Sequence, residues 1–138
     1  MELFRLRVLA SDAPFFDGPC RSVTVPCVGG ELGILAHHSN LIAAVVPGEL
    51  RFQPEEGASR TAAVSSGLLK IEGGEVLLLV DTAERPEDID ANRARRAADA
   101  AREAMLQKRS IQEYRSAQAD LARAVSRLRA KEHRHGPY

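Results

Sequence analysis

Residues 84–94 read Glu-Arg-Pro-Glu-Asp-Ile-Asp-Ala-Asn-Arg-Ala, and the pattern of the chain changes across them. Before them, apolar and polar residues alternate with period two between Gly and Pro, which is typical of strands. After them, residues 89–131 contain no Gly and no Pro but hold twelve Ala and nine Arg, a composition that favours helix. The sequence therefore predicts two parts, a β part in residues 1–84 and a helical part in residues 85–138.

The β part has the pattern of eight or more short strands. Alternation begins at Phe4–Val8, and turn signals such as Pro47-Gly48 and Gly73-Gly74 separate the later strands. Residues 41–46 are all apolar and predict a strand buried on both faces. Short strands at this spacing predict an antiparallel β-sandwich or flattened barrel.

The helical part has the pattern of two helices. Pro86 suits the entry to a helix, Asp88 or Asp90 can cap the first one, and Ser110 can cap the second. The apolar stripe of the first helix is Ala94, Ala97, Ala98, Ala101, Ala104 and Met105. The stripe of the second is Ile111, Tyr114, Ala117, Leu121, Val125 and Leu128. Two such stripes joined by a few residues predict an antiparallel helical hairpin.

The small side chains of this hairpin bear on function. Each buried methyl contributes roughly 0.8 kcal/mol, so an alanine face gains only several kcal/mol from packing. A ligand of millimolar affinity contributes about 4 kcal/mol at the standard state. Because the two energies are comparable, a ligand or a partner could decide whether the hairpin is folded or opened.

The charge of the chain is balanced overall but not along its length. The formal net charge is zero, and the surplus of basic residues falls in residues 107–135, with eight basic and three acidic side chains. This surplus indicates an anionic ligand or an acidic partner surface. A nucleic-acid-binding arm is a poorer reading, because aromatic residues are not interleaved with the basic ones.

Several function classes lack support in the sequence. The first residues begin a strand pattern and not a basic and then apolar leader, so no signal peptide is predicted, and the run 41–46 is too short to span a bilayer. Cys20 and Cys27 have no zinc-type spacing, which favours two ordinary thiols in a reducing cytosol and no metal site. No nucleophile elbow or phosphate loop occurs, so no catalytic residue is predicted.

Four segments carry a resemblance to a known family. Residues 30–38 read Gly-Glu-Leu-Gly-Ile-Leu-Ala-His-His, residues 47–51 Pro-Gly-Glu-Leu-Arg, residues 66–71 Ser-Gly-Leu-Leu-Lys-Ile, and residues 76–84 Val-Leu-Leu-Leu-Val-Asp-Thr-Ala-Glu. In this order, and in a chain of this length and layout, they resemble the epsilon subunit of the F-type ATP synthase. The resemblance covers the whole chain.

The resemblance implies a non-catalytic subunit of the central stalk. Its β-sandwich, residues 1–84, would bind the gamma subunit and the ring of membrane rotor (c) subunits, and so couple proton-driven rotation to ATP synthesis. Its hairpin, residues 85–138, would extend toward the catalytic alpha and beta subunits and inhibit ATP hydrolysis. The implied location is the cytoplasmic side of the bacterial inner membrane, with the membrane reached only through partner subunits.

The resemblance also implies a nucleotide site. Residues 89–94, Ile-Asp-Ala-Asn-Arg-Ala, fit the nucleotide motif of the family, in which Ile or Leu and Asp are followed by any two residues, Arg and Ala. The ligands implied for ATP, which would be a regulatory ligand and not a required cofactor, are Glu84, Ile89, Asp90, Arg93, Ala94, Arg123 and Arg127. This chain departs from the pattern at Ala100, where a further arginine is expected.

The same residues have plainer interpretations. Asp90 can simply cap the helix, and the arginines can be a solvated face. A free-standing nucleotide sensor, whose hairpin closes on ATP, is the alternative to the motor subunit.

Two partner surfaces follow from the resemblance. Glu31, Gly33 and His38 match the loop near the rotor ring, although Gly33 can serve a turn and His38 can cap a loop. The resemblance also implies that basic residues of the second helix dock on an acidic loop of the catalytic subunit. The plainer interpretation is that they form a solvated charged face. These residues are Arg123, Arg127, Arg129, Lys131 and Arg134.

Overall fold

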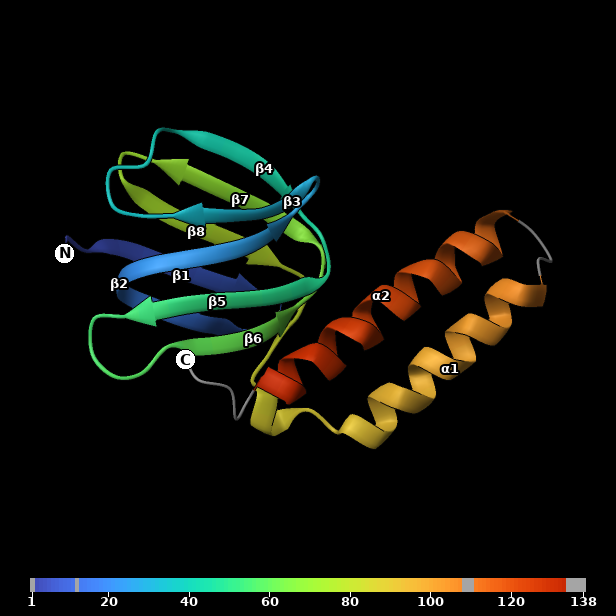
Figure 1. Ribbon diagram of the computed structural model, residues 1–138. Coiled ribbons are helices and arrows are strands. Elements are labelled where there is room, and N and C mark those ends of the chain that lie inside the picture. Colours follow the sequence, from blue (N-terminus) through green and yellow to red (C-terminus); the bar gives the residue numbers. More distant parts are fainter. Residues whose placement is uncertain (1, 12, 108–110, 134–138) are drawn as a thin grey trace.

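The computed structural model describes residues 2–11, 13–107 and 111–133. Within these residues the chain forms nine strands, then one 3₁₀ helix and two α-helices (Figure 1). The strands are β1 (Phe4–Ala10), β2 (Pro14–Cys27), β3 (Gly30–Ile34), β4 (Leu41–Val45), β5 (Gly48–Pro54), β6 (Arg60–Val64), β7 (Gly67–Glu72), β8 (Glu75–Val80) and β9 (Ala83–Glu84). The helices are η1 (Pro86–Asp88), α1 (Ala91–Gln107) and α2 (Ile111–His133).

The strands lie in two facing layers. One layer has the order β1, β8, β7, β4, and the other has the order β2, β5, β6, β9 with β3 beside β2. The long β2 pairs with β1 and, through Cys27 and Val45, with β4, so the layers join into a flattened barrel. Pairing is antiparallel except between β1 and β8, which are parallel. The predicted fold class, an antiparallel sandwich followed by a two-helix antiparallel hairpin, is confirmed with this one parallel pair.

The core fills the space between the two layers. Alternate residues of β1, β7 and β8 point inward, and the largest fully buried side chains include Leu6, Leu69 and Leu78. Both cysteines are buried and free, and burial raises the pKa of the Cys20 thiol to about 11. The sandwich thus closes its apolar core with residues of the β part alone.

Strand β4 differs from the sequence prediction. Residues 41–46 were expected to be buried on both faces, but only one face of β4 points into the core. Ile42 is 66% exposed and Ala44 is exposed on the outer face. The prediction was wrong because an all-apolar strand can also have an apolar outer face.

The two helices of the hairpin pack against each other mainly through alanines. The buried residues of α1 are Ala94, Ala98 and Ala101, three members of its predicted stripe. On α2 the predicted stripe is only partly right, because Ile111 and Tyr114 are exposed while Ala117 is buried. The other buried positions of α2 are Ala124, Ser126 and Ala130, which were not in the predicted stripe. The predicted cap Ser110 lies outside the described residues.

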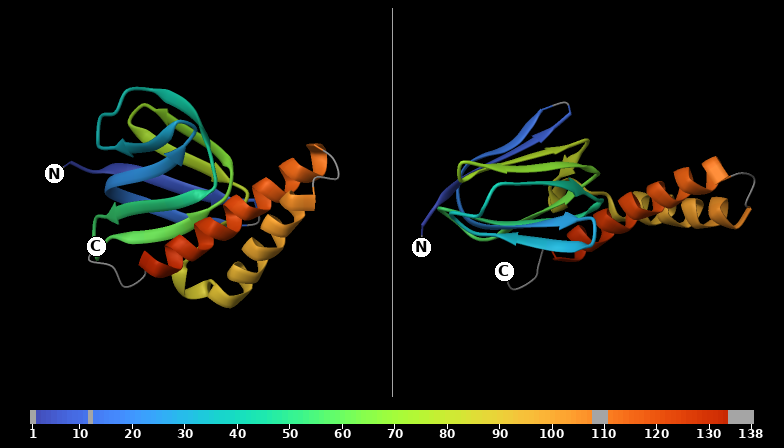
Figure 2. Two further views of the ribbon diagram at one scale, coloured as in Figure 1. Left: turned by 45° about the vertical axis from the view of Figure 1, so that its right-hand side comes forward. Right: turned by 90° about the horizontal axis from the view of Figure 1, so that it is seen from above.

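The hairpin meets the sandwich at one end only. Figures 1 and 2 show α2 lying beside the sandwich through its C-terminal part, with α1 on the far side of α2 and the tip of the hairpin projecting away. The strands that α2 contacts most are β5 and β6, and it also contacts η1. The beginning of α1 and the end of α2 therefore lie together, next to the change of pattern at residues 84–94.

Candidate functional site

The chain leaves the sandwich through a short, well-packed segment. After β9, Pro86 is buried at the start of η1, and Ile89 is buried in a cluster with Ala63 of β6 and Ala130 of α2. Proline suits this position because its fixed φ matches a helix entry and its missing N–H needs no partner. The side chain of Ile89 therefore packs against protein.

Asp90 is the N-cap of α1. Its Oδ1 accepts a hydrogen bond of 3.1 Å from the backbone N–H of Arg93, a typical capping contact. This hydrogen bond, together with the nearby Arg96 and Arg93, holds the pKa of the Asp90 carboxyl below its ordinary value. Asp88 and Asp90 were both predicted as possible caps, and Asp90 makes the capping hydrogen bond. This agrees with the plainer interpretation of Asp90 as a helix cap.

Three of the predicted nucleotide ligands do come together. The Nε of Arg127 donates a 2.7 Å hydrogen bond to Oε1 of Glu84. A terminal nitrogen of the same guanidinium also lies 2.7 Å from this oxygen. Arg123, one turn earlier on α2, is paired with Asp120. These three residues line a hollow between the sandwich and α2, together with Ala63, Val64, Ser65, Thr82 and Ser126.

The hollow is smaller than a usual ligand site. The centre of a water-sized sphere can move through only about 10 Å³ of it, which is room for about one water molecule, whereas small-molecule sites usually enclose roughly 300–1,000 Å³. Ile89, Asp90, Arg93 and Ala94 do not line it. Ala94 is buried on α1, and Arg93 is exposed. The structure thus brings Glu84, Arg123 and Arg127 together but not the other four predicted ligands.

Further contacts at this junction were missed by sequence reasoning. Ser126 Oγ donates a 2.7 Å hydrogen bond to the carbonyl of Gly48, and Lys131 Nζ donates a 3.1 Å hydrogen bond to the carbonyl of Pro86. The available signal was that Ser126 precedes Ala130 by four residues, so that both lie on one helical face of small side chains.

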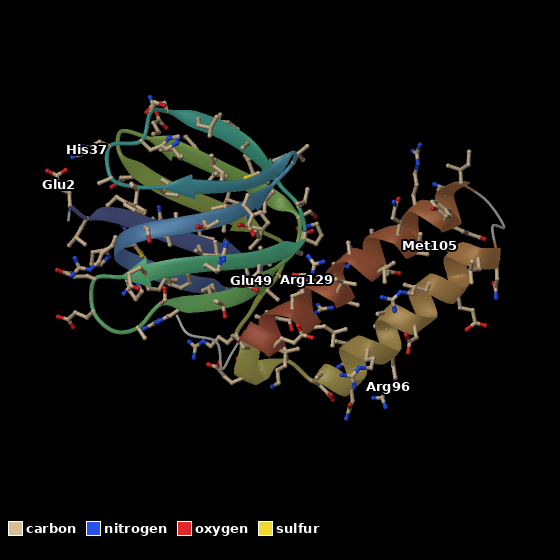
Figure 3. All side chains as sticks on the ribbon, in the orientation of Figure 1. Glu2, His37, Glu49, Arg96, Met105 and Arg129 are labelled. Atoms are coloured by element: carbon tan, nitrogen blue, oxygen red, sulfur yellow. The ribbon has the colours of Figure 1, made fainter. Side chains whose placement is uncertain are left out.

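The basic residues predicted to dock on a catalytic subunit are mostly engaged within the chain. Arg123 and Arg127 form ion pairs, and Lys131 is half-buried against η1. Arg129 is exposed and lies at the junction of α2 and β5, where Glu49 also lies (Figure 3). Arg134 lies outside the described residues. A uniformly solvated face, the plainer interpretation, does not describe these residues.

The residues predicted to face the rotor ring lie along β3 and the loop after it. Glu31 accepts a 2.6 Å hydrogen bond from Arg51, and a side chain at Gly33 would meet open space. His38 donates from Nδ1 to the carbonyl of Ser39 at 2.8 Å, consistent with loop capping. Glu31 and Gly33 lie on β3 itself, whereas His38 lies in the loop that follows the strand.

The loop after β3 has two features that the sequence did not indicate. His37 has a positive φ of 66°, which is uncommon for a residue other than glycine. Its ring is paired with Glu2, and Figure 3 shows both at the end of the sandwich away from the helices. The pair joins this loop to the N-terminal segment.

A second surface lies on the outer face of the β1–β8–β7–β4 layer. Ala44, Leu68 and Leu79 stand in register on neighbouring strands, and Ile42 lies beside them on β4. Ile42, Leu68 and Leu79 are among the exposed large apolar residues, and Ala44 is exposed as well. We call Ile42, Ala44, Leu68 and Leu79 the outer apolar face. A contiguous apolar surface of this kind is typical of a protein interface.

Across residues 2–11, 13–107 and 111–133, no three His, Cys, Asp or Glu side chains are grouped so that they could hold a metal ion. No helix in the same part of the chain is both long and apolar enough to span a membrane.

Known proteins resemble this chain along nearly its entire length. The beta-sandwich domain of the ATP synthase delta/epsilon chain matches residues 3–86, and its long alpha-helix domain matches residues 87–132. The ATP synthase epsilon chain of Ruminiclostridium cellulolyticum is 41% identical over 134 residues, 97% of this chain and 99% of the relative. That of Thioalkalivibrio sulfidiphilus is 35% identical over 127 residues, 91% of this chain and 90% of the relative.

A solved structure has the same fold. A chain of the Euglena gracilis mitochondrial ATP synthase, from the OSCP/F1/c-ring assembly, superposes with a TM-score of 0.82 at 23% identity, covering 95% of this chain and 82% of that one. The family matches and the close relatives together identify the chain. It belongs to the ATP synthase delta/epsilon chain family, as a non-catalytic subunit of the epsilon type.

Proposed function

We propose that this chain is the epsilon subunit of the central stalk of a proton-driven rotary ATP synthase. The observation that carries the proposal is the family membership over residues 3–132. The solved structures with a similar fold come from assemblies described as F1/c-ring and central stalk/c-ring, which supports the same placement. The complex would lie at the bacterial inner membrane on its cytoplasmic side, and this chain would reach the membrane through its partners.

The sandwich, residues 1–84, is the proposed attachment to the rotor. The outer apolar face is a suitable surface for the gamma subunit, because burying three large exposed apolar side chains stabilises an interface. Glu31, Gly33 and His38, on and after β3, are the proposed contacts of the c ring. Through these surfaces the sandwich would transmit rotation without performing chemistry.

Reconstitution tests the attachment. An enzyme depleted of this subunit should regain proton-coupled ATP synthesis when the chain is added. Leu68→Glu combined with Leu79→Glu should prevent this recovery, because two carboxylates would be placed in an apolar interface. Ala58→Glu, at an exposed position in the loop between β5 and β6, is the matched control and should leave recovery intact. Full recovery with the double variant would reject this surface.

The hairpin, residues 85–138, is the proposed regulatory part. In the docked arrangement, Arg127 is bound to Glu84 and Lys131 is bound to the carbonyl of Pro86, so both cations are held by groups outside the hairpin helices. An acidic loop of the catalytic beta subunit could therefore take these cations only after the end of α2 leaves the sandwich. Docking on the sandwich and docking on the catalytic subunits thus exclude each other, which is the property that an inhibitory switch needs.

ATP is proposed as a regulatory ligand of the hairpin, because the side chains of Glu84, Arg123 and Arg127 line one hollow. Entry of a nucleotide would require the hollow to widen and Arg127 to share its donors between Glu84 and a phosphate. Calorimetry on the isolated chain with millimolar magnesium ATP tests the idea. Heat that is lost in Arg127→Gln but kept in Arg102→Gln supports it, and no heat with the natural chain rejects it.

The same titration bears on the alternative, a free-standing nucleotide sensor. Co-purification of the chain with the gamma subunit and the catalytic hexamer supports the motor subunit. ATP binding by a chain that is isolated only as a free monomer would support the sensor.

A further inference from the structure

The C-terminal part of α2 forms three hydrogen bonds to β5, β9 and η1. Ser126, Arg127 and Lys131 reach, in turn, the carbonyl of Gly48, the carboxylate of Glu84 and the carbonyl of Pro86. We call these three contacts the α2 latch. Positions 126, 127, 130 and 131 share one face of the helix, so all three contacts are made at once.

The Ser126 contact is buried and rigidly placed. Ser126 is only 4% exposed, and its hydroxyl donates to a carbonyl at 2.7 Å. The acceptor cannot shift easily, because Gly48 packs so closely on Pro26 that a Cβ added at Gly48 would lie 2.6 Å from the Pro26 Cβ. A buried hydroxyl is costly to leave without its partner, so this contact favours one position of α2.

The ion pair of Glu84 and Arg127 is partly shielded from water. The side chains are 28% and 33% exposed, whereas those of Asp99 and Arg102, an ion pair on α1, are 70% and 56% exposed. Two nitrogens of Arg127 approach the same oxygen of Glu84. A pair in this environment is screened less by salt than an exposed one.

Apolar packing at the same place is slight. The buried apolar cluster at this place joins Ala130 of α2 to Ala63 of β6 and to Ile89, and two of its three side chains are single methyl groups. α1 is held through the alanines that it packs on α2. Since this apolar cluster is small, the polar contacts of the latch are the main candidates for holding both helices docked.

We propose that the α2 latch holds the hairpin on the sandwich with protein groups alone, so that docking needs no nucleotide. Two donors of Arg127 already serve Glu84, and an incoming phosphate would compete with that carboxylate for them. The inference deepens the proposed regulatory role, but it concerns the full-length chain by itself. Its outcome is therefore independent of whether the chain assembles into a synthase.

Spin labels at two exposed sites can measure docking. Val28→Cys on the sandwich and Leu106→Cys on α1 are 71% and 79% exposed, so labels there should not disturb packing. Cys20 and Cys27 are buried with raised thiol pKa values and should react slowly. The distance distribution between the two labels reports the docked and undocked fractions in full-length protein without nucleotide.

The proposal predicts one main distance for the doubly labelled chain without nucleotide. Glu84→Arg should raise the undocked fraction about tenfold or more, because it removes a charge-assisted contact and places two cations together. The swapped pair Glu84→Arg with Arg127→Glu should restore docking. Asp99→Arg is the matched control, because it makes the same acid-to-arginine substitution in the exposed ion pair on α1, and it should have little effect on the undocked fraction.

Ser126→Ala is the second latch variant. It removes the hydroxyl that reaches Gly48, and it should raise the undocked fraction about fivefold. A circular dichroism spectrum like that of the parent chain confirms that each variant is folded. The proposal is overturned if the parent chain needs magnesium ATP to show one main distance, or if neither Glu84→Arg nor Ser126→Ala changes the distribution.

Discussion

The sandwich and the hairpin of this chain are stabilised by side chains of different size. The sandwich encloses Leu, Ile, Val and Phe side chains with almost no exposure. The hairpin buries mainly alanines, and it reaches the sandwich through a few polar contacts. A fully buried Leu or Ile contributes about 1.5–3 kcal/mol, compared with roughly 0.8 kcal/mol for one methyl group.

The difference in side-chain size fits the two proposed roles, attachment by the sandwich and movement by the hairpin. A core of large side chains keeps the outer apolar face and the β3 region fixed. A hairpin held by small side chains can leave the sandwich at a cost that a partner or ligand can supply. Substitutions in the two regions should therefore differ in how much they lower the free energy of unfolding and in how much of the chain they destabilise.

The largest effect is expected in the core of the sandwich. Leu78 is fully buried on β8, and Leu78→Ala should lower the free energy of unfolding by about 4 kcal/mol, because a cavity remains. Leu79→Ala, the next residue on the same strand and 40% exposed, should cost far less. Urea unfolding followed by circular dichroism measures both. Equal losses at the two positions would contradict the assigned inward and outward faces.

A glycine contact should come next. A Cβ at Gly67 would lie 1.9 Å from the carbonyl oxygen of Leu79, so Gly67→Ala forces β7 and β8 apart and should cost about 3 kcal/mol. Gly33→Ala is the control, since its Cβ would meet nothing within 4 Å. Thermal unfolding compares the two. A stable Gly67→Ala variant would show that the two strands do not approach so closely.

A smaller and local effect is expected in the hairpin. Ala98 is buried between the helices, and Ala98→Leu should overfill that space at a local cost of about 1–3 kcal/mol. Ala97→Leu, at an exposed neighbour, should be tolerated. Hydrogen exchange should show faster exchange in α1 and α2 of Ala98→Leu, with the sandwich unchanged. Faster exchange throughout the sandwich would mean that the two regions unfold together.

The smallest effect is a dependence on pH at the start of α1. The pKa of Asp90 is lowered in the folded chain, so the contribution of its cap is present above the ordinary Asp pKa of about 4. It is lost as the pH falls through the lowered value. Protection of the amides of residues 91–94, corrected for the intrinsic pH dependence of exchange, should fall more between pH 5 and pH 2 in the parent chain than in Asp90→Ala. The same fall in both proteins would contradict the capping role.

The fold was largely predictable because the sequence shows a clear strand periodicity and, after it, a clear helical periodicity. Alternation before Pro86 and alanine spacing after it predict the sandwich and the hairpin. The outer face of β4 was not predictable, because an all-apolar segment does not show which of its faces meets the core. Exposed Ile111 and Tyr114 were missed for a related reason, since a helical stripe does not show where its partner helix ends.

The candidate site was predictable only in part. Glu84 and Arg127 do meet, although 42 residues lie between them, and the resemblance alone suggested it. The contact of Ser126 with Gly48 depends on where β5 begins relative to α2, which no local pattern specifies. Likewise, nothing local shows that Ala94 and Ile89 pack against protein and do not line the hollow.

We propose that the sandwich attaches the chain to the rotor while the hairpin regulates ATP hydrolysis. Deleting residues 86–138 and assaying the assembled enzyme tests it most directly, because the core of the sandwich uses only residues that the truncated chain keeps. ATP synthesis coupled to proton flow should survive in the assembled enzyme, and ATP hydrolysis should rise. Unchanged hydrolysis in an enzyme that has bound the truncated chain would contradict it.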